Sequence, residues 1–129
     1  MGLVQSFYVV EKEDIIDNFD FIDNHGVKYG GEEFASYSKD YDIYNWMHTL
    51  WEKKVVASPS HGSIPLDEEY LLLNKDDILR LEKDFQNKKI RFHREDEDIN
   101  ARLEERFQEF LNTAKKYVES NYAIYYEVR

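Results

Sequence analysis

The sequence of 129 residues contains no cysteine. Without thiols the chain cannot form a disulfide, a zinc–thiolate or iron–sulfur site, or a cysteine nucleophile. Its uninterrupted apolar runs are short, whereas a membrane-spanning helix needs about 20 apolar residues. Residues 1–5 also lack the basic and apolar regions of a signal peptide. We therefore expect a cytoplasmic protein with no membrane partner.

Basic side chains are few, with 17 Lys and Arg against 27 Asp and Glu, so the net charge is −10. Nucleic-acid phosphates are bound through cations, so this balance disfavours direct contact with nucleic acid. Residues 11–42 carry ten acidic and three basic side chains, a net charge of −7. Residues 43–129 carry seventeen acidic and fourteen basic side chains, a net charge of −3. The acidity is therefore concentrated in the first third of the chain.

Aromatic residues are plentiful at 16% of the chain, which excludes a disordered acidic tail. Residues 3–10, 70–73 and 122–128 are rich in β-branched, aromatic or aliphatic side chains and predict strands. Segment 11–39 mixes acids with turn signals such as Gly30-Gly31. It predicts an acidic insertion or long loop region with one short helix or hairpin.

Apolar residues at spacings of three and four predict helices over 40–54, 74–86 and 96–119. Asp40 and Asn74 are placed to cap the first two, with Asp77 completing a capping box in the second. Lys53 and Lys54 suit the C-terminal end of the first helix dipole. Residues 90–93 are expected to be extended.

These elements predict one α+β domain over residues 1–129. The N- and C-terminal strands should pair in a small antiparallel sheet, because the final strand needs a partner. Strand 70–73 could lie beside them, and about three helices should cover one face of the sheet.

Catalytic motifs are missing from this sequence. Its four histidines (at positions 25, 48, 61 and 93) show no metal-ligand spacing such as HExxH. Gly30-Gly31 is followed by two glutamates that would repel phosphate, and no serine lies in a GxSxG elbow. We therefore predict no catalytic residue, no metal and no cofactor, and a protein that is not an enzyme.

Helix 40–54 carries more aromatic residues than one buried stripe can hold. At roughly 100° per residue, Trp46 lies about 160° from Tyr44. Either segment 11–39 wraps this helix, which is the favoured interpretation, or one aromatic face is offered to a partner. Exposed Tyr and Trp are typical anchors of binding surfaces.

Several short motifs occur in a recognisable order. They are Met1-Gly2-Leu3, then Lys39, Ile43, Asn45 and Trp46, then Tyr70, Leu72, Asp77, Ile78 and residues 81–85 (LEKDF), and finally Tyr125-Tyr126. In this order the chain resembles a family of small uncharacterised proteins of tailed phages and some bacteria. Members begin MGLDMYLY and have an IHNW-type helix and a C-terminal YY strand. The resemblance implies a phage accessory protein that acts in the host cytoplasm.

The chain departs from that family at three polar positions. Val4 stands where the family has Asp, and Ser38 and Tyr44 stand where it has Arg and His. Loss of groups that could exchange protons favours binding over catalysis.

The leading hypothesis is a non-catalytic counter-defence inhibitor. It would present carboxylates, as a DNA mimic does, to a host protein with a basic, nucleic-acid-binding surface. The predicted contact residues are Glu11, Glu13, Asp14, Asp17, Asp20, Asp23, Glu32, Glu33, Tyr41, Tyr44 and Trp46, with acids 95–98 as a second patch. One alternative is a small enzyme or ligand-binding protein with a pocket between sheet and helices, lined by tyrosines, His48 and carboxylates. Another is a protein–protein module or homodimer that uses its aromatics.

Overall fold

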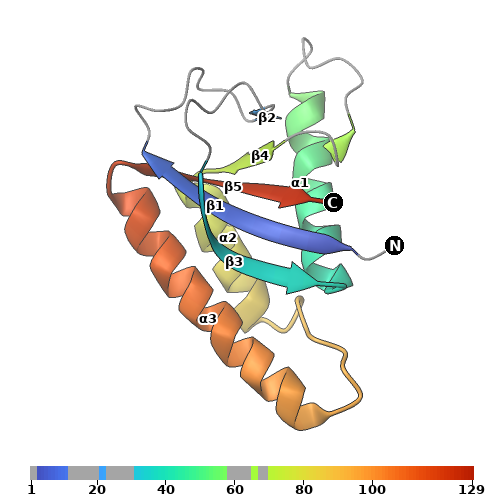
Figure 1. Ribbon diagram of the computed structural model, residues 1–129. Coiled ribbons are helices and arrows are strands. Elements are labelled where there is room, and N and C mark those ends of the chain that lie inside the picture. Colours follow the sequence, from blue (N-terminus) through green and yellow to red (C-terminus); the bar gives the residue numbers. More distant parts are fainter. Residues whose placement is uncertain (1–2, 12–20, 23–30, 58–64, 67–69) are drawn as a thin grey trace.

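The structure is a computed structural model that describes residues 3–11, 21–22, 31–57, 65–66 and 70–129. These residues form a five-stranded antiparallel sheet and three helices, an α+β fold as predicted (Figure 1). In chain order the elements are β1 (Val4–Glu11), β2 (Phe21–Ile22), β3 (Glu32–Ser38), α1 (Tyr41–Val56), β4 (Tyr70–Leu73), α2 (Lys75–Gln86), α3 (Glu97–Glu119) and β5 (Tyr122–Val128). The strand order across the sheet is β2-β4-β5-β1-β3.

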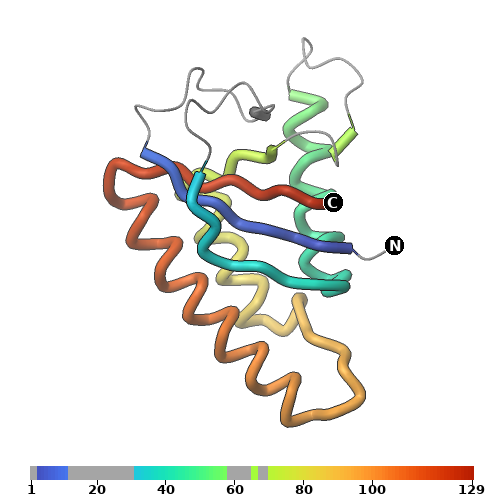
Figure 2. Tube along the Cα trace, viewed as in Figure 1, coloured from blue at the N-terminus to red at the C-terminus, as the bar shows by residue number. Residues whose placement is uncertain are grey.

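The two end strands pair in the middle of the sheet, which confirms the prediction. β1 and β5 are antiparallel from Gln5 opposite Val128 to Glu11 opposite Tyr122. Just beyond, Val4 and Arg129 exchange backbone hydrogen bonds of 3.0 and 2.9 Å. The two ends of the described chain therefore lie beside each other (Figure 2).

Segment 70–73 forms β4 beside β5, as the sequence predicted, with Leu71 opposite Tyr126. The last strand begins and ends where its alternation predicted, at 122–128, and β1 is shifted by one residue from the predicted 3–10.

The prediction that 11–39 is an insertion or long loop is wrong for its last part. Residues 32–38 form β3, which pairs with β1 and lies at the edge of the described sheet. Phe34 and Tyr37 pack into the core, while Glu32 and Glu33 stay exposed. A bulge shifts the register of β3 against β1 between Phe7 and Tyr8. An interrupted edge strand with one covered face shows no clean alternation of apolar residues. Phe21 and Ile22 of the same segment form β2, which pairs with β4, and residues 12–20 and 23–30 lie outside the described residues.

The helix starts show which capping predictions were correct. Asn74 and Asp77 form the predicted capping box, with backbone-to-side-chain hydrogen bonds of 2.9 and 3.0 Å. Asp96 caps α3 by accepting a hydrogen bond of 2.8 Å from the backbone of Asp98. Asp40 does not cap α1, because its side chain is buried beside Arg94 instead.

The core lies between the sheet and the three helices, which pack on one face as predicted (Figure 1). Aromatic rings dominate it. Phe7 of β1 contacts Phe110 of α3 at 4.4 Å between centroids and Tyr126 of β5 at 5.4 Å. Burial of each such side chain contributes about 1.5–3 kcal/mol. Segment 90–93 joins no strand of the described sheet, and Ile90 and Phe92 reach into this core.

A salt bridge and a hydrogen bond join α2 to α3. Glu82 accepts hydrogen bonds from Lys115 Nζ at 2.8 Å and from Gln108 Nε2 at 3.2 Å. The Lys115 contact holds the pKa of Glu82 below its usual range. None of the helices in the described part of the chain is long and apolar enough to cross a membrane.

Candidate functional site

Three of the predicted acidic residues meet at one end of the sheet. Glu11 ends β1, and Glu32 and Glu33 begin β3, whose Glu32 pairs with Val9 two residues before Glu11. We call Glu11, Glu32 and Glu33 the acidic corner. All three are exposed, and neither Glu32 nor Glu33 forms an ion pair with any described residue. The carboxylates of Glu32 and Glu33 are therefore available to a partner.

The other five predicted acids are Glu13, Asp14, Asp17, Asp20 and Asp23, and they lie outside the described residues. The segment that contains them leaves β1 at Glu11 and reaches β3 at Glu32, on the neighbouring strand. The chain between Glu11 and Glu32 thus begins and ends at the acidic corner, and within it Phe21 and Ile22 form β2 at the opposite edge of the sheet.

The structure separates the predicted aromatic contacts from the acidic corner. Tyr41 begins α1 and is 57% exposed. It follows the far end of β3, and a seven-residue strand is about 20 Å long. Tyr44 is half-buried against the core. The six predicted contact residues that the structure describes therefore do not form one continuous surface.

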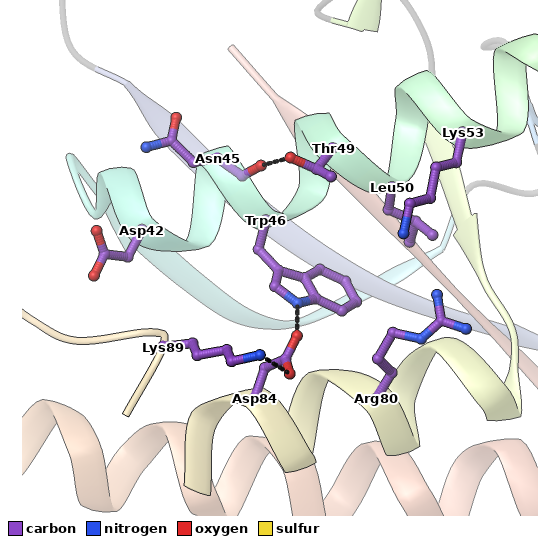
Figure 3. A pocket seen from close by; sticks show the side chains of 9 residues that line it. All are labelled: Asp42, Asn45, Trp46, Thr49, Leu50, Lys53, Arg80, Asp84 and Lys89. Atoms are coloured by element: carbon purple, nitrogen blue, oxygen red, sulfur yellow. Dashed lines mark hydrogen bonds and ion pairs between the residues drawn. The ribbon is translucent and has the colours of Figure 1, made fainter. Parts of the chain in front are cut away.

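Trp46 is covered by α2 rather than by the described part of segment 11–39. Its indole Nε1–H donates a hydrogen bond of 2.8 Å to Asp84 of α2, and Lys89 lies 3.8 Å from the same carboxylate (Figure 3). The ring forms one wall of an open cleft between α1 and α2, with a volume of about 360 Å³. The sequence could not show this, because helix-face arithmetic does not reveal which helix lies opposite.

His48 does not join the tyrosines of the sheet in a pocket. Its Nδ1 lies 2.9 Å from Glu52, one turn along α1, and its ring contacts Tyr44 and Trp51. The groove between β3 and α3 is lined by Phe34, Ala35, Tyr37, Arg106, Glu109, Phe110 and Thr113. It contains no histidine, so the predicted grouping of tyrosines, His48 and carboxylates is not formed there.

A tyrosine cluster lies instead on the sheet face away from the helices. Tyr8, Tyr70 and Tyr125 have ring centroids 4.9 to 6.0 Å apart. Tyr8 donates a hydrogen bond of 3.1 Å to Glu127. Burial and the Glu127 charge raise the pKa of Tyr70 to about 12 and also raise the pKa of Tyr8. These hydroxyls therefore stay protonated at neutral pH. The alternation of β5 placed Tyr125 and Glu127 on one face and was the sequence signal for this cluster.

Gly31 packs directly over this cluster. A Cβ at position 31 would lie 2.5 Å from the Tyr125 hydroxyl oxygen and 3.0 Å from the Cβ of Tyr8. This close approach explains why position 31 is a glycine, since any larger residue would clash with Tyr125.

A buried polar network lies where β3 meets α1. Tyr126 donates a hydrogen bond of 2.7 Å to Gln5, whose amide donates one of 2.9 Å to the Asp40 carbonyl. Arg94 Nη1 lies 2.9 Å from the Asp40 carboxylate. Burial raises the pKa of Asp40, and Arg94 opposes that shift. The network joins β1, β5 and α1.

Nothing in the described ranges groups three or more His, Asp or Glu side chains closely enough to hold a metal ion. The chain matches no protein-family model, and comparison with curated proteins and with solved structures finds no similar protein.

Proposed function

We propose that the protein is a non-catalytic phage accessory protein that binds a host protein through its acidic side chains. The host target is a protein with a basic surface that binds nucleic acid. Occupying that surface with carboxylates excludes the nucleic acid, which is the action of a DNA mimic in host takeover or counter-defence. The phage origin and the host cytoplasm rest on the family resemblance described above.

The observation that carries this proposal is the acidic corner. Glu32 and Glu33 are exposed, adjacent and without an ion pair among the described residues. They lie where segment 12–31, which contains five further acidic residues, begins and ends. A field of one sign speeds association with an oppositely charged partner and makes it sensitive to salt.

The test compares two variants of equal net charge. The double variant Glu32→Lys/Glu33→Lys changes the acidic corner. The control Glu105→Lys/Glu109→Lys makes the same charge change at two exposed positions of α3. We expect capture of a nucleic-acid-binding protein from host lysate by the native protein and the control, and at least a tenfold loss for the corner variant. Capture should fall as salt rises, and added double-stranded DNA should compete for the captured protein.

Equal capture by all three proteins would reject the acidic corner as the contact surface. Retained capture by a further variant with Asp14, Asp17, Asp20 and Asp23 all changed to Lys would reject the acidic segment as well. A captured protein that does not bind nucleic acid would contradict the mimicry.

A further inference from the structure

Positive charge gathers at one place in this acidic chain. Residues 80–94 contain six Lys and Arg but only two Asp and Glu, a net charge of +4. The start of this segment forms one side of the cleft between α1 and α2, and Lys53 of α1 faces it from the other side (Figure 3). We call this hollow the α1/α2 cleft. Its lining residues are Asp42, Asn45, Trp46, Thr49, Leu50, Lys53, Arg80, Asp84 and Lys89.

Both carboxylates of the α1/α2 cleft are already engaged. Asp84 accepts the Trp46 indole N–H at 2.8 Å and lies 3.8 Å from Lys89. Asp42 accepts the backbone N–H of Arg91 at 2.9 Å, and its carboxylate lies 3.0 Å from His93 Nε2. Neither carboxylate is therefore directed at the remaining cations of the cleft.

Two cations in the α1/α2 cleft have no side-chain partner among the described residues. Lys53 and Arg80 are exposed, and neither side chain forms a hydrogen bond or ion pair within the part of the chain that the structure describes. Figure 3 shows them pointing toward one another from opposite helices, on the same side of the Trp46 ring. Two like charges that converge repel each other, and an anion between them would replace repulsion with two attractions.

We propose that the α1/α2 cleft binds the phosphate group of a small phosphorylated molecule. The guanidinium of Arg80 offers a fork of donors that fits phosphate oxygens, and Lys53 adds a second charge. A phosphate monoester carries close to two negative charges at neutral pH and so matches two free cations, whereas a carboxylate carries one. The cleft volume of about 360 Å³ is in the range of small-molecule sites.

Trp46 supplies the apolar wall of this site. Its indole N–H is already used on Asp84, so the ring is held in place and its face is left for the rest of the ligand. A flat ring beside the phosphate, as in a mononucleotide, would stack there. This proposal uses residues outside the acidic corner, so the two proposals can fail separately.

The experiment follows Trp46 directly. The chain has two tryptophans, and Trp51→Phe leaves Trp46 as the only one. This variant is titrated with inorganic phosphate, ribose 5-phosphate and AMP at constant ionic strength, by fluorescence and by isothermal titration calorimetry. We expect saturable binding of at least one probe. Arg80→Ala and Lys53→Ala should each weaken it at least tenfold, because each removes one of the two charges.

Lys83→Ala is the matched control, since Lys83 is an exposed cation of α2 outside the cleft lining. It should change the affinity less than twofold. Tighter binding of AMP than of ribose 5-phosphate would assign the Trp46 face to a ring, and equal binding of all three probes would assign the site to free phosphate. The proposal is overturned if no probe binds by either method, or if Lys83→Ala weakens binding as much as Arg80→Ala.

Discussion

Asp77 and Asp40 are both buried carboxylates paired with one cation, yet their surroundings differ. Asp77 Oδ2 accepts hydrogen bonds from Lys54 Nζ at 2.8 Å and from the backbone of Asn74 at 3.0 Å. The Lys54 side chain is itself buried at 10% exposure, and its Nζ also donates to the Leu72 carbonyl at 2.6 Å. Asp77 Oδ2 therefore accepts two hydrogen bonds, and Lys54 Nζ donates two.

Asp40 has an ion pair but fewer hydrogen bonds. Its side chain is 1% exposed, whereas that of its partner Arg94 is 34% exposed. Neither carboxylate oxygen of Asp40 accepts a well-aligned hydrogen bond from a described residue. Burial raises the pKa of this carboxyl despite the neighbouring charge. The two sites therefore differ in their donors: Asp77 accepts directed hydrogen bonds, whereas Asp40 is compensated mainly by the charge of Arg94.

The largest effect is expected when the better satisfied pair is broken. Lys54→Ala should lower the free energy of unfolding by about 3–5 kcal/mol, because it leaves the Asp77 charge buried and the Leu72 carbonyl without its donor. Urea unfolding followed by circular dichroism measures this loss. Its neighbour Lys53 is exposed, so Lys53→Ala is the control and should change stability by less than about 0.5 kcal/mol. Equal effects of the two substitutions would show that the buried pair contributes no specific stability.

A smaller loss is expected at the second pair. Arg94→Ala removes the cation next to Asp40 and the donor to the Ser38 carbonyl, which Arg94 Nη2 reaches at 3.0 Å. It should destabilise the protein by about 1–3 kcal/mol, as expected when a buried group loses its partner. Arg102→Ala, at an exposed position of α3, is the control for loss of a surface charge. A loss at Arg94 larger than that at Lys54 would reverse the comparison.

The smallest effect, and one of opposite sign, is expected from Asp40→Asn. The folded pKa of Asp40 is raised, so the folded protein holds this proton at pH values where the unfolded chain has released it. The stability that the protonated form contributes is present at low pH and is lost as pH rises through the raised pKa. Asp40→Asn should therefore equal the native protein near pH 3 and be slightly more stable at pH 7. Unfolding curves of both proteins at pH 3 and pH 7 measure the difference in their free energies of unfolding. The prediction is contradicted if the variant loses stability relative to the native protein as the pH rises.

The elements that the sequence predicted well have local signals. The capping box at Asn74 and Asp77 and the alternation of β5 are written in neighbouring residues. β3 was missed because an edge strand with a bulge buries only part of one face. Lys54 was assigned to the helix dipole, although Ile43, Met47, Leu50 and Lys54 recur at spacings of four and three along the buried stripe of α1. That spacing was the available sign that Lys54 lies inside.

The candidate sites were less predictable, because they depend on pairings between distant segments. The sequence placed the negative charge near Glu32 and Glu33, but only the β1–β3 register shows that Glu11 joins them. The α1/α2 cleft had no signal in the order of residues, because Trp46 and Asp84 are 38 positions apart. The sequence alone does not show whether the Asp40 side chain caps α1 or is buried, because this depends on where Arg94 lies in the fold.

The hydrogen bonds between Val4 and Arg129 have a practical consequence for handling this protein. β1 runs from Val4 to the acidic corner at Glu11, and eight residues of strand extend about 25 Å. An affinity tag or surface linkage at either terminus therefore emerges at the end of the sheet opposite the carboxylates. Immobilising the chain by either end leaves the acidic corner facing the solution, and a short linker between the ends would give a circular chain with new termini placed elsewhere.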